Sequence, residues 1–301
     1  MMYQYLAIDI GGSFVKYSQI DPAGNLAGSH KVKTPNSLAE LTDIIENLIA
    51  DMGSTIRGVA ISCPGRIDEA TGTVYKGGAL PFLHEFCFKQ FVASISPAPC
   101  VVMNDGKAAA LSELWLGNLK GIENGAAILL GTGVGGGIVL NSEMIQGRHF
   151  QAGELSFMPD HIGRPGQENY FGHSASAVGF VRQAASLLGL ANLDDGLAVF
   201  DAINQQTSQE VCLLFEAYCQ KVVHIILDLQ AILDLDRVVI GGGISAQPIV
   251  IETISKQYHL IRNRSQIMVD SLEPIEIMAC KFGNEANLLG AIYRLLIELD
   301  R

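Results

Sequence analysis

Asp105 lies between two kinds of sequence in this 301-residue chain. The apolar residues 101–103 before it predict a buried strand, and the alanines at 108–110 after it predict a helix. A carboxylate at such a junction is commonly only a helix N-cap. The same position would also let the carboxylate orient a hydroxyl group and accept its proton, which phosphoryl transfer requires of one protein residue. Asp105 is therefore the candidate general base.

A second carboxylate stands beside glycines in the run Asp9-Ile10-Gly11-Gly12-Ser13, directly after an apolar segment. Glycines let a backbone approach a phosphate closely, and a neighbouring carboxylate can hold hydrated Mg²⁺. A tight hairpin with a solvated aspartate is the alternative that this run leaves open.

Residues 131–137 read GTGVGGG, which is five glycines in seven positions. Gly131, Gly133 and Gly136 match the dinucleotide-binding fingerprint, but that fingerprint needs a helix immediately afterwards. Here residues 138–140 are strand-like, which disfavours an NAD-dependent oxidoreductase. A glycine-rich hairpin can still cradle phosphate through its free N–H groups, and a purely structural turn is the alternative.

The glycines at 241–243 follow the strand-like residues 238–240. A strand that ends in glycines before a helix is a usual place for the adenosine of a nucleotide, although close helix–strand packing would also explain them. Glu154 and Glu168 could bind sugar hydroxyls, but isolated surface carboxylates are ordinary. His149, His161 and His173 have no cysteines nearby, so we expect no zinc site.

The elements that must position these residues follow one order twice. Strands are expected at residues 3–10, 14–21, 26–34, 56–63 and 100–104. A helix is expected at 37–51, and glycine or a helix-like segment follows each of the last two strands, which gives the order βββαβαβα. From residue 125 we expect strands at 126–130, 136–140, 144–146, 238–240 and 274–278, and helices at 208–235, 248–261 and 285–299. We therefore predict two duplicated α/β domains, 1–118 and 119–284, around a central cleft that closes on a substrate.

The composition bounds the class of protein. Hydrophobic residues make up 49% of the chain and charged residues 17%, which is typical of a globular protein. The net charge of −11 disfavours nucleic acid and anionic membranes as partners and is compatible with a neutral sugar. No apolar run approaches the ~20 residues that span a bilayer. We read the six cysteines as reduced thiols and expect a cytoplasmic protein.

Taken in order, these segments resemble the ROK family of bacterial sugar kinases, which has the hexokinase–actin–heat-shock ATPase fold. The likeness covers essentially the whole chain and is most specific at residues 130–138 and 152–154. The run from Asp9 also resembles the first phosphate motif of the family, with Ser13 in place of its usual threonine. The resemblance implies two actin-like, ribonuclease-H-like domains, with the helix at about 285–301 packed back on the first.

The resemblance also implies roles for single residues. Asp105 would be the base, and the sugar ligands would be Asn104, Glu154, Glu168 and Gly65. Asp9 would hold Mg²⁺ through water. The remaining implied ligands of ATP are Gly11, Gly12, Ser13, Gly131, Thr132, Gly133, Gly135, Gly136, Gly242 and Gly243. A homodimer with a small-molecule sugar substrate is expected.

Some residues depart from the family pattern. The family usually continues Ala-Gly-Glu-x-Gly-His, whereas this chain has Ser156 and Phe157 at the last two positions. Its cysteine-rich zinc loop is replaced by residues 161–167, so no zinc is expected. Ala79 stands where the family often has asparagine. These changes favour a different or longer sugar, with Phe157 stacked on a second ring or an aglycone. The pattern is similar to the zinc-free β-glucoside kinase subgroup, which phosphorylates the 6-hydroxyl of the non-reducing glucose.

Other functions stay open. Glucose, N-acetylmannosamine and fructose are alternative substrates. A ROK transcription regulator would need an N-terminal helix-turn-helix, which we do not expect before a strand at residue 3. A non-catalytic sugar-binding protein is the remaining alternative.

Overall fold

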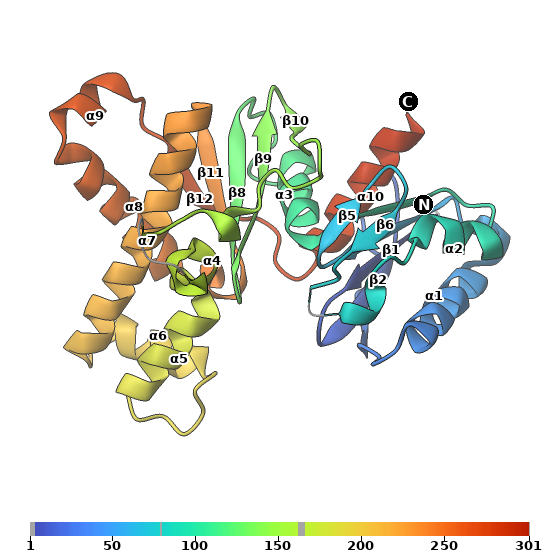
Figure 1. The fold of residues 1–301 in the computed structure, drawn as a ribbon, viewed down its shortest axis with the longest axis horizontal. Helices are drawn as coiled ribbons and strands as arrows, with labels where there is room; N and C mark the ends of the chain where they lie inside the picture. The colour runs from blue at the N-terminus through green and yellow to red at the C-terminus, as the bar shows by residue number, and fades with distance from the viewer. Residues whose placement is uncertain (1–3, 79, 162–165, 301) are drawn as a thin grey trace. The chain divides into compact units, whose positions relative to one another are not determined.

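The computed structural model describes residues 4–78, 80–161 and 166–300, and it divides into two compact units (Figure 1). Unit 1 contains the residues up to Lys120, the segment Gln146–Ala152 and the residues from Asn284 onward. Unit 2 contains Gly121–Ile145 and Gly153–Gly283. The chain thus returns to unit 1 for one short segment, which the sequence analysis did not anticipate. The domain division at 118/119 stays a prediction.

Unit 1 is built on a five-stranded mixed sheet in the order β3-β2-β1-β4-β7. Its first three strands pair antiparallel, and β1, β4 and β7 pair in parallel. β1 and β4 are buried along their whole length, as their apolar runs predict. The bounds are β1 (Tyr5–Ile10), β2 (Phe14–Ile20), β3 (His30–Lys33), β4 (Gly58–Cys63) and β7 (Cys100–Asn104), with a separate hairpin of β5 (Arg66–Asp68) and β6 (Thr73–Tyr75).

Four α-helices belong to the described part of unit 1. They are α1 (Leu38–Met52), α2 (Phe88–Ile95), α3 (Asp105–Trp115) and α10 (Ala286–Leu299). Ser37 caps the start of α1, since its side chain accepts a hydrogen bond from the Glu40 amide. α10 packs against α3 and against β1 and β4. The last helix of the chain therefore lies beside the elements that carry Asp9 and Asp105.

Unit 2 repeats this arrangement in the order β10-β9-β8-β11-β12. β10, β9 and β8 pair antiparallel, and β8, β11 and β12 pair in parallel. The bounds are β8 (Gly125–Leu130), β9 (Val134–Leu140), β10 (Glu143–Met144), β11 (Arg237–Gly241) and β12 (Glu276–Ala279). Because the two sheets share one order and one pattern of directions, the predicted duplicated α/β fold is confirmed. The central cleft stays a prediction.

The helices of unit 2 include four that the sequence analysis did not predict, α4, α5, α6 and α9. Of these, α5 and α6 pack on each other and on α7 (Figure 1). α7 agrees with the expected helix at 208–235: Ser208 caps its start, and Asp234 ends it in a left-handed conformation. The bounds are α4 (Phe171–Ser174), α5 (Ala177–Leu187), α6 (Gly196–Asn204), α7 (Gln209–Leu233), α8 (Pro248–Asn263) and α9 (Gln266–Ser271). None of the helices in the described residues is long and apolar enough to cross a membrane.

Candidate functional site

Two candidate carboxylates of unit 1 lie at one edge of its sheet. In the parallel register, Asp9 on β1 pairs with Ser62 on β4, and Cys63 pairs with Asn104 at the end of β7. Asp105 follows Asn104 directly and begins α3. Carboxyl ends of parallel strands are the usual place for ligands in open α/β sheets. The register therefore brings Asp9 and Asp105, which are far apart in sequence, to the same edge.

The N-cap of α3 is Asn104 and not Asp105. Asn104 Oδ1 accepts a hydrogen bond from the Lys107 amide at 3.2 Å, and Asp105 Oδ1 accepts one from the Gly106 amide at 2.8 Å. Asp105 is thus the first helical residue, where the helix dipole favours a negative charge. The capping role that a carboxylate at this junction often has is taken by its neighbour.

The amide of Asn104 has a second contact within unit 1. Its Nδ2 donates to the carbonyl oxygen of Gly65 at 3.0 Å. Gly65 has φ +100°, and a Cβ there would overlap the carbonyl of Lys76, so only glycine fits. Asn104 and Gly65, both implied as sugar ligands, therefore contact each other; their binding of a sugar stays a prediction.

Asp9 is held from two directions. Its side chain is buried at 5% exposure, and its Oδ1 accepts from Ser62 Oγ at 2.6 Å and from Asn287 Nδ2 at 3.0 Å. The sequence analysis did not identify either donor. Ser62 is found from strand register, whereas Asn287 lies 278 residues away and carries no local signal.

The turn after Asp9 is closed by one buried threonine. Thr34 Oγ1 donates to the Gly11 carbonyl at 2.6 Å, and the Thr34 amide donates to the Ser13 carbonyl at 3.0 Å. Gly12 and Ser13 are exposed between β1 and β2. The turn is thus anchored through its carbonyl oxygens, which leaves an exposed tip that suits a phosphate loop.

Cys63 lies beside both carboxylates without adding charge. Burial raises the pKa of its thiol well above the usual range, and the negative charges of Asp105 and Asp9 raise it further. The thiol therefore stays neutral at physiological pH.

Lys107 fixes the segment that returns to unit 1. Its side chain is only 2% exposed, and its Nζ donates to the Phe150 carbonyl at 2.8 Å and to Gln146 Oε1 at 3.2 Å. The sequence analysis did not single out this lysine. It ties the stretch immediately before Gly153 and Glu154 to the helix that Asp105 begins.

In unit 2 the glycines at 135–137 belong to the start of β9, and residues 131–133 form the turn between β8 and β9. Ser156 fixes its far end, because its Oγ accepts from the Val134 amide at 3.0 Å and donates to the Val134 carbonyl at 3.1 Å. A Cβ on Gly133 would lie 2.8 Å from Ser156 Oγ, and one on Gly136 would lie 2.6 Å from Leu155 Cδ1. Packing within the protein therefore explains these two glycines. Thr132 is exposed in the turn, and Gly135 is half-buried in β9.

Two other glycines have no such packing reason. A Cβ on Gly131 would meet nothing nearer than the Gly133 carbonyl at 4.0 Å, and one on Gly243 would meet nothing within 4 Å. Gly242 differs, because it has φ +99° and a Cβ there would overlap the Leu130 carbonyl. Gly131 and Gly243 are therefore glycines that face open space, as a closely approaching ligand requires.

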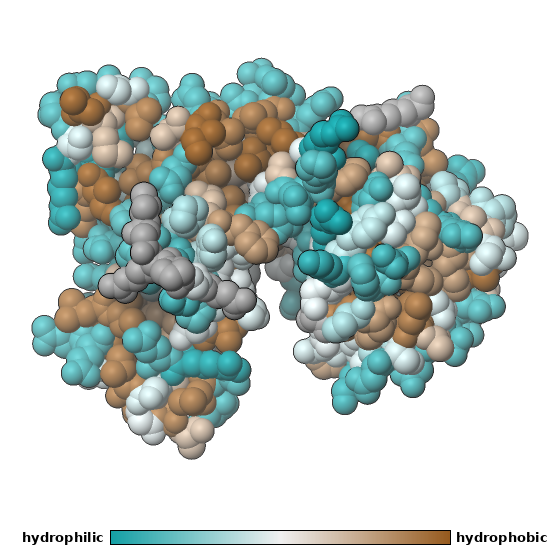
Figure 2. Space-filling model, viewed as in Figure 1, coloured by the Kyte–Doolittle hydropathy of each residue, from teal (hydrophilic) through white to brown (hydrophobic). Residues whose placement is uncertain are grey.

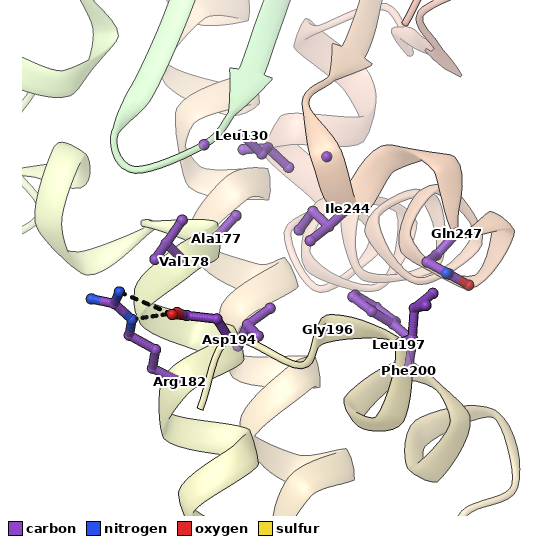
Figure 3. A pocket seen from close by; sticks show the side chains of 13 residues that line it. Leu130, Ala177, Val178, Arg182, Asp194, Gly196, Leu197, Phe200, Ile244 and Gln247 are labelled. Atoms are coloured by element: carbon purple, nitrogen blue, oxygen red, sulfur yellow. Dashed lines mark hydrogen bonds and ion pairs between the residues drawn. The ribbon is translucent and has the colours of Figure 1, made fainter. Parts of the chain in front are cut away.

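Gly131 and Gly243 line the same pocket of about 550 Å³ (Figure 3). Its walls are mainly apolar and come from the end of β8, from α5 and α6, and from the 3₁₀ turn Gly243–Ala246. The lining residues are Leu130, Gly131, Ala177, Val178, Val181, Arg182, Asp194, Gly196, Leu197, Phe200, Gly243, Ile244 and Gln247. A mainly apolar pocket lined by few polar groups and several glycines suits a nucleoside.

The two charged residues that line this pocket, Arg182 and Asp194, lie together on one side of it (Figure 3). Arg182 on α5 donates from Nε to Asp194 Oδ1 at 2.7 Å and from Nη2 to Asp194 Oδ2 at 3.4 Å. Gln247 lies at the opposite side, next to α8 (Figure 3). Because the ion pair is exposed, it contributes little to the stability of the protein.

The remaining implied sugar ligands lie in unit 2. Glu154 is half-buried before the 3₁₀ turn Leu155–Phe157, and Glu168 is exposed in the turn Gln167–Asn169. Phe157 is 71% exposed, so its ring is available to a ligand. These three belong to a different unit from Asn104 and Gly65, and their convergence on one sugar stays a prediction.

Some sequence expectations fall outside the described residues. Ala79 does, and so do residues 162–165 of the loop that replaces the zinc loop of the family. Among residues 4–78, 80–161 and 166–300, no three His, Cys, Asp or Glu side chains are grouped to hold a metal ion.

Comparison with known proteins gives the class. The ROK family profile matches residues 5–297. A β-glucoside kinase of Listeria monocytogenes is 28% identical over an alignment of 302 positions that covers 98% of each chain. A ROK family protein from Streptococcus pneumoniae in complex with sucrose has a TM-score of 0.88 at 25% identity, covering 98% of this chain and 99% of that one. A ROK glucokinase from Streptomyces griseus, in complex with glucose and AMPPNP, has a TM-score of 0.77 at 25% identity and covers 95% and 97%.

The two mixed sheets with glycine turns at their edges thus define a duplicated ATPase-type fold, as the sequence predicts. Within that class, the chain belongs to the ROK family.

Proposed function

We propose that this protein is an ATP-dependent sugar kinase that transfers the γ-phosphoryl group of ATP to a sugar hydroxyl. The observation that carries the proposal is the unit 2 pocket, whose lining includes two glycines that packing does not require. The AMPPNP complex of the Streptomyces glucokinase, at 25% identity, supports ATP as the donor. Adenosine would occupy the apolar pocket, with the phosphates at Gly131 and the glycine turn.

In unit 1, Asp105 accepts the proton of the attacking hydroxyl. Its place at the start of α3 fixes its carboxylate, because the Gly106 amide binds Oδ1 and Asn104 caps the helix. Orientation and proton transfer are the main protein contributions to such a reaction. The proposal includes that the pocket of unit 2 and Asp105 of unit 1 act on the same bound pair of ATP and sugar.

Asp9 fits hydrated Mg²⁺. In the residues that the structure describes, both hydrogen bonds to its carboxylate end on Oδ1, which leaves Oδ2 for a metal-bound water. Mg²⁺ in phosphoryl-transfer sites is usually held by one or two carboxylates and the phosphates, with several waters. The bound ion would offset negative charge on the phosphates. No zinc is part of the proposal.

For the acceptor we propose the 6-hydroxyl of glucose or of the non-reducing glucose of a β-glucoside. The Listeria β-glucoside kinase, aligned over 98% of both chains, supports the longer substrate. The 71% exposure of Phe157 adds a physical reason, because an exposed ring can stack on a second sugar or an aglycone. Asn104, Gly65, Glu154 and Glu168 would bind the hydroxyls.

A coupled assay of ADP release tests the function directly. The acceptors are glucose, N-acetylmannosamine, fructose, cellobiose and aryl β-glucosides, with ATP and Mg²⁺. We expect turnover on glucose or a β-glucoside. Turnover on N-acetylmannosamine or fructose alone would contradict the acceptor, and sugar binding without turnover on any acceptor would identify a binding protein.

We further propose a homodimer in the cytoplasm, without nucleic acid or membrane partners. The charge of −11 supports the last point. Hydrophobic surface is scattered over the visible face (Figure 2), and Ile232 and Ile267 of unit 2 are 76% and 78% exposed. Light scattering after size exclusion gives the oligomeric state, and a monomeric mass would contradict the dimer.

Filling the pocket should weaken ATP binding. Val178 on α5 lines the pocket, so Val178→Trp should place an indole where adenosine lies and raise KM for ATP at least about tenfold, or ~1.4 kcal/mol. Gln183→Trp is the matched control, because Gln183 is exposed on the same helix and does not line the pocket. An equal KM for both variants would place the nucleotide elsewhere.

A further inference from the structure

The carboxylate of Asp9 is bound asymmetrically. Ser62 Oγ, from β4, and Asn287 Nδ2, from α10, both donate to Oδ1, at 2.6 Å and 3.0 Å. Within the described part of the chain, no side chain donates to Oδ2. A carboxylate held by one oxygen has a fixed rotamer and one oxygen aimed away from its protein donors.

Asn287 is itself held firmly. Within α10, Gly290 packs against α3 so closely that a Cβ would overlap the Ala108 carbonyl. Tyr293 stacks on Trp115 of α3 with ring centroids 5.1 Å apart and planes inclined by 3°. The amide that contacts Asp9 is thus fixed relative to the helix that Asp105 begins.

Ordinary helix capping does not account for this asparagine. The N-cap position of α10 is Glu285, which makes no side-chain cap, and Asn287 directs its Nδ2 across to β1. Asn284, nearby, accepts a hydrogen bond from Lys16 at 3.3 Å and is not one of the two donors to Asp9. The two asparagines therefore have separable roles.

We propose that Asn287, with Ser62, is a positioning residue for Asp9: the two donors fix Oδ1 so that Oδ2 is presented to the hydrated cation of the nucleotide. This inference rests on the proposed function. A purely structural alternative is that Asn287 only fastens α10 to the sheet. The positioning role predicts that loss of Asn287 changes the Mg²⁺ dependence of nucleotide binding, whereas the structural role predicts no such change.

The test compares Asn287→Leu, which keeps the size and removes the donor, with Asn287→Gln, which keeps an amide, and with the control Asn284→Leu. Calorimetry measures ADP binding with Mg²⁺ and with EDTA, and turnover is titrated with Mg²⁺. Removing a hydrogen-bond partner of a metal-binding group typically costs 10–100-fold in metal affinity. We expect about a tenfold rise in half-saturating Mg²⁺ and weaker Mg·ADP binding for Asn287→Leu, and unchanged ADP binding in EDTA.

Trp115 reports whether α10 has moved, because it stacks on Tyr293. We expect its emission to be unchanged in Asn287→Leu, and Asn287→Gln to regain at least part of the Mg²⁺ response. If Asn287→Leu alters the emission or the unfolding midpoint but leaves the Mg²⁺ dependence of ADP binding as in the wild type, the role is structural and the proposal is wrong.

Two further outcomes separate this inference from the function. If the wild type phosphorylates no sugar but its Mg·ADP binding still depends on Asn287, the kinase assignment fails and the positioning role stands. If the wild type is active and Asn287→Leu has the same Mg²⁺ response, only the positioning role fails. Should Asn287→Leu not fold, Ser62→Ala removes the other donor to the same oxygen and must show the same shift.

Discussion

Replacing Asp105 by asparagine should lower kcat by about 100-fold or more, because general-base catalysis contributes 10²–10⁴-fold and an amide cannot accept the proton. The backbone should be unaffected. Asparagine can still accept the hydrogen bond from the Gly106 amide through its Oδ1, and the helix cap comes from Asn104. ATP and sugar affinity should therefore stay close to those of the wild type.

Calorimetric binding beside steady-state turnover checks this prediction. Asp51→Asn is the matched control, because Asp51 is an exposed aspartate at the end of α1, away from the sheet edge that holds Asp9 and Asp105. The control should keep full turnover. Near-normal turnover of Asp105→Asn would remove Asp105 as the base, and loss of nucleotide binding would show that its charge acts on ligands instead.

Strand register explains why the positions of Asp9 and Asp105 could be predicted from the sequence. An apolar run fixes where a strand lies, and parallel pairing then fixes which residues share its carboxyl end. Asp9 and Asp105 each follow such a run, so both could be assigned to one sheet edge. Asn287 could not, because it reaches Asp9 from a helix at the other end of the chain and hydrogen bonds of that kind leave no periodic signal.

The pocket of unit 2 could be predicted only in part from the sequence. Two of its lining glycines stand in runs that the sequence analysis singled out, but a large part of its wall comes from α5 and α6, which were not predicted. In α5 the signal was present: Ala177, Phe180, Val181, Ala184 and Ala185 are buried at helical spacing, and Ser176 caps the helix. The sequence could not show which glycines serve a ligand and which serve packing, because Gly131 and Gly133 differ only in their three-dimensional neighbours.

Gly290→Ala should destabilise the protein by at least about 2 kcal/mol, although glycine to alanine inside a helix usually stabilises by ~0.5–1 kcal/mol. The sign reverses because the added Cβ would overlap the Ala108 carbonyl of α3. A backbone oxygen cannot rotate away, so α10 must shift as a whole. Urea unfolding followed by Trp115 fluorescence measures the change.

Gly283→Ala is the control, since a Cβ there meets nothing within 4 Å, and its unfolding free energy should change little. The shift of α10 should also draw Asn287 from Asp9, so Gly290→Ala should raise the half-saturating Mg²⁺ while the pocket of unit 2 keeps its affinity for ADP in EDTA. A stabilised Gly290→Ala variant would contradict the close approach of α10 and α3. That outcome would also mean that the contact between α10 and α3 is not a common support for the two carboxylates of unit 1.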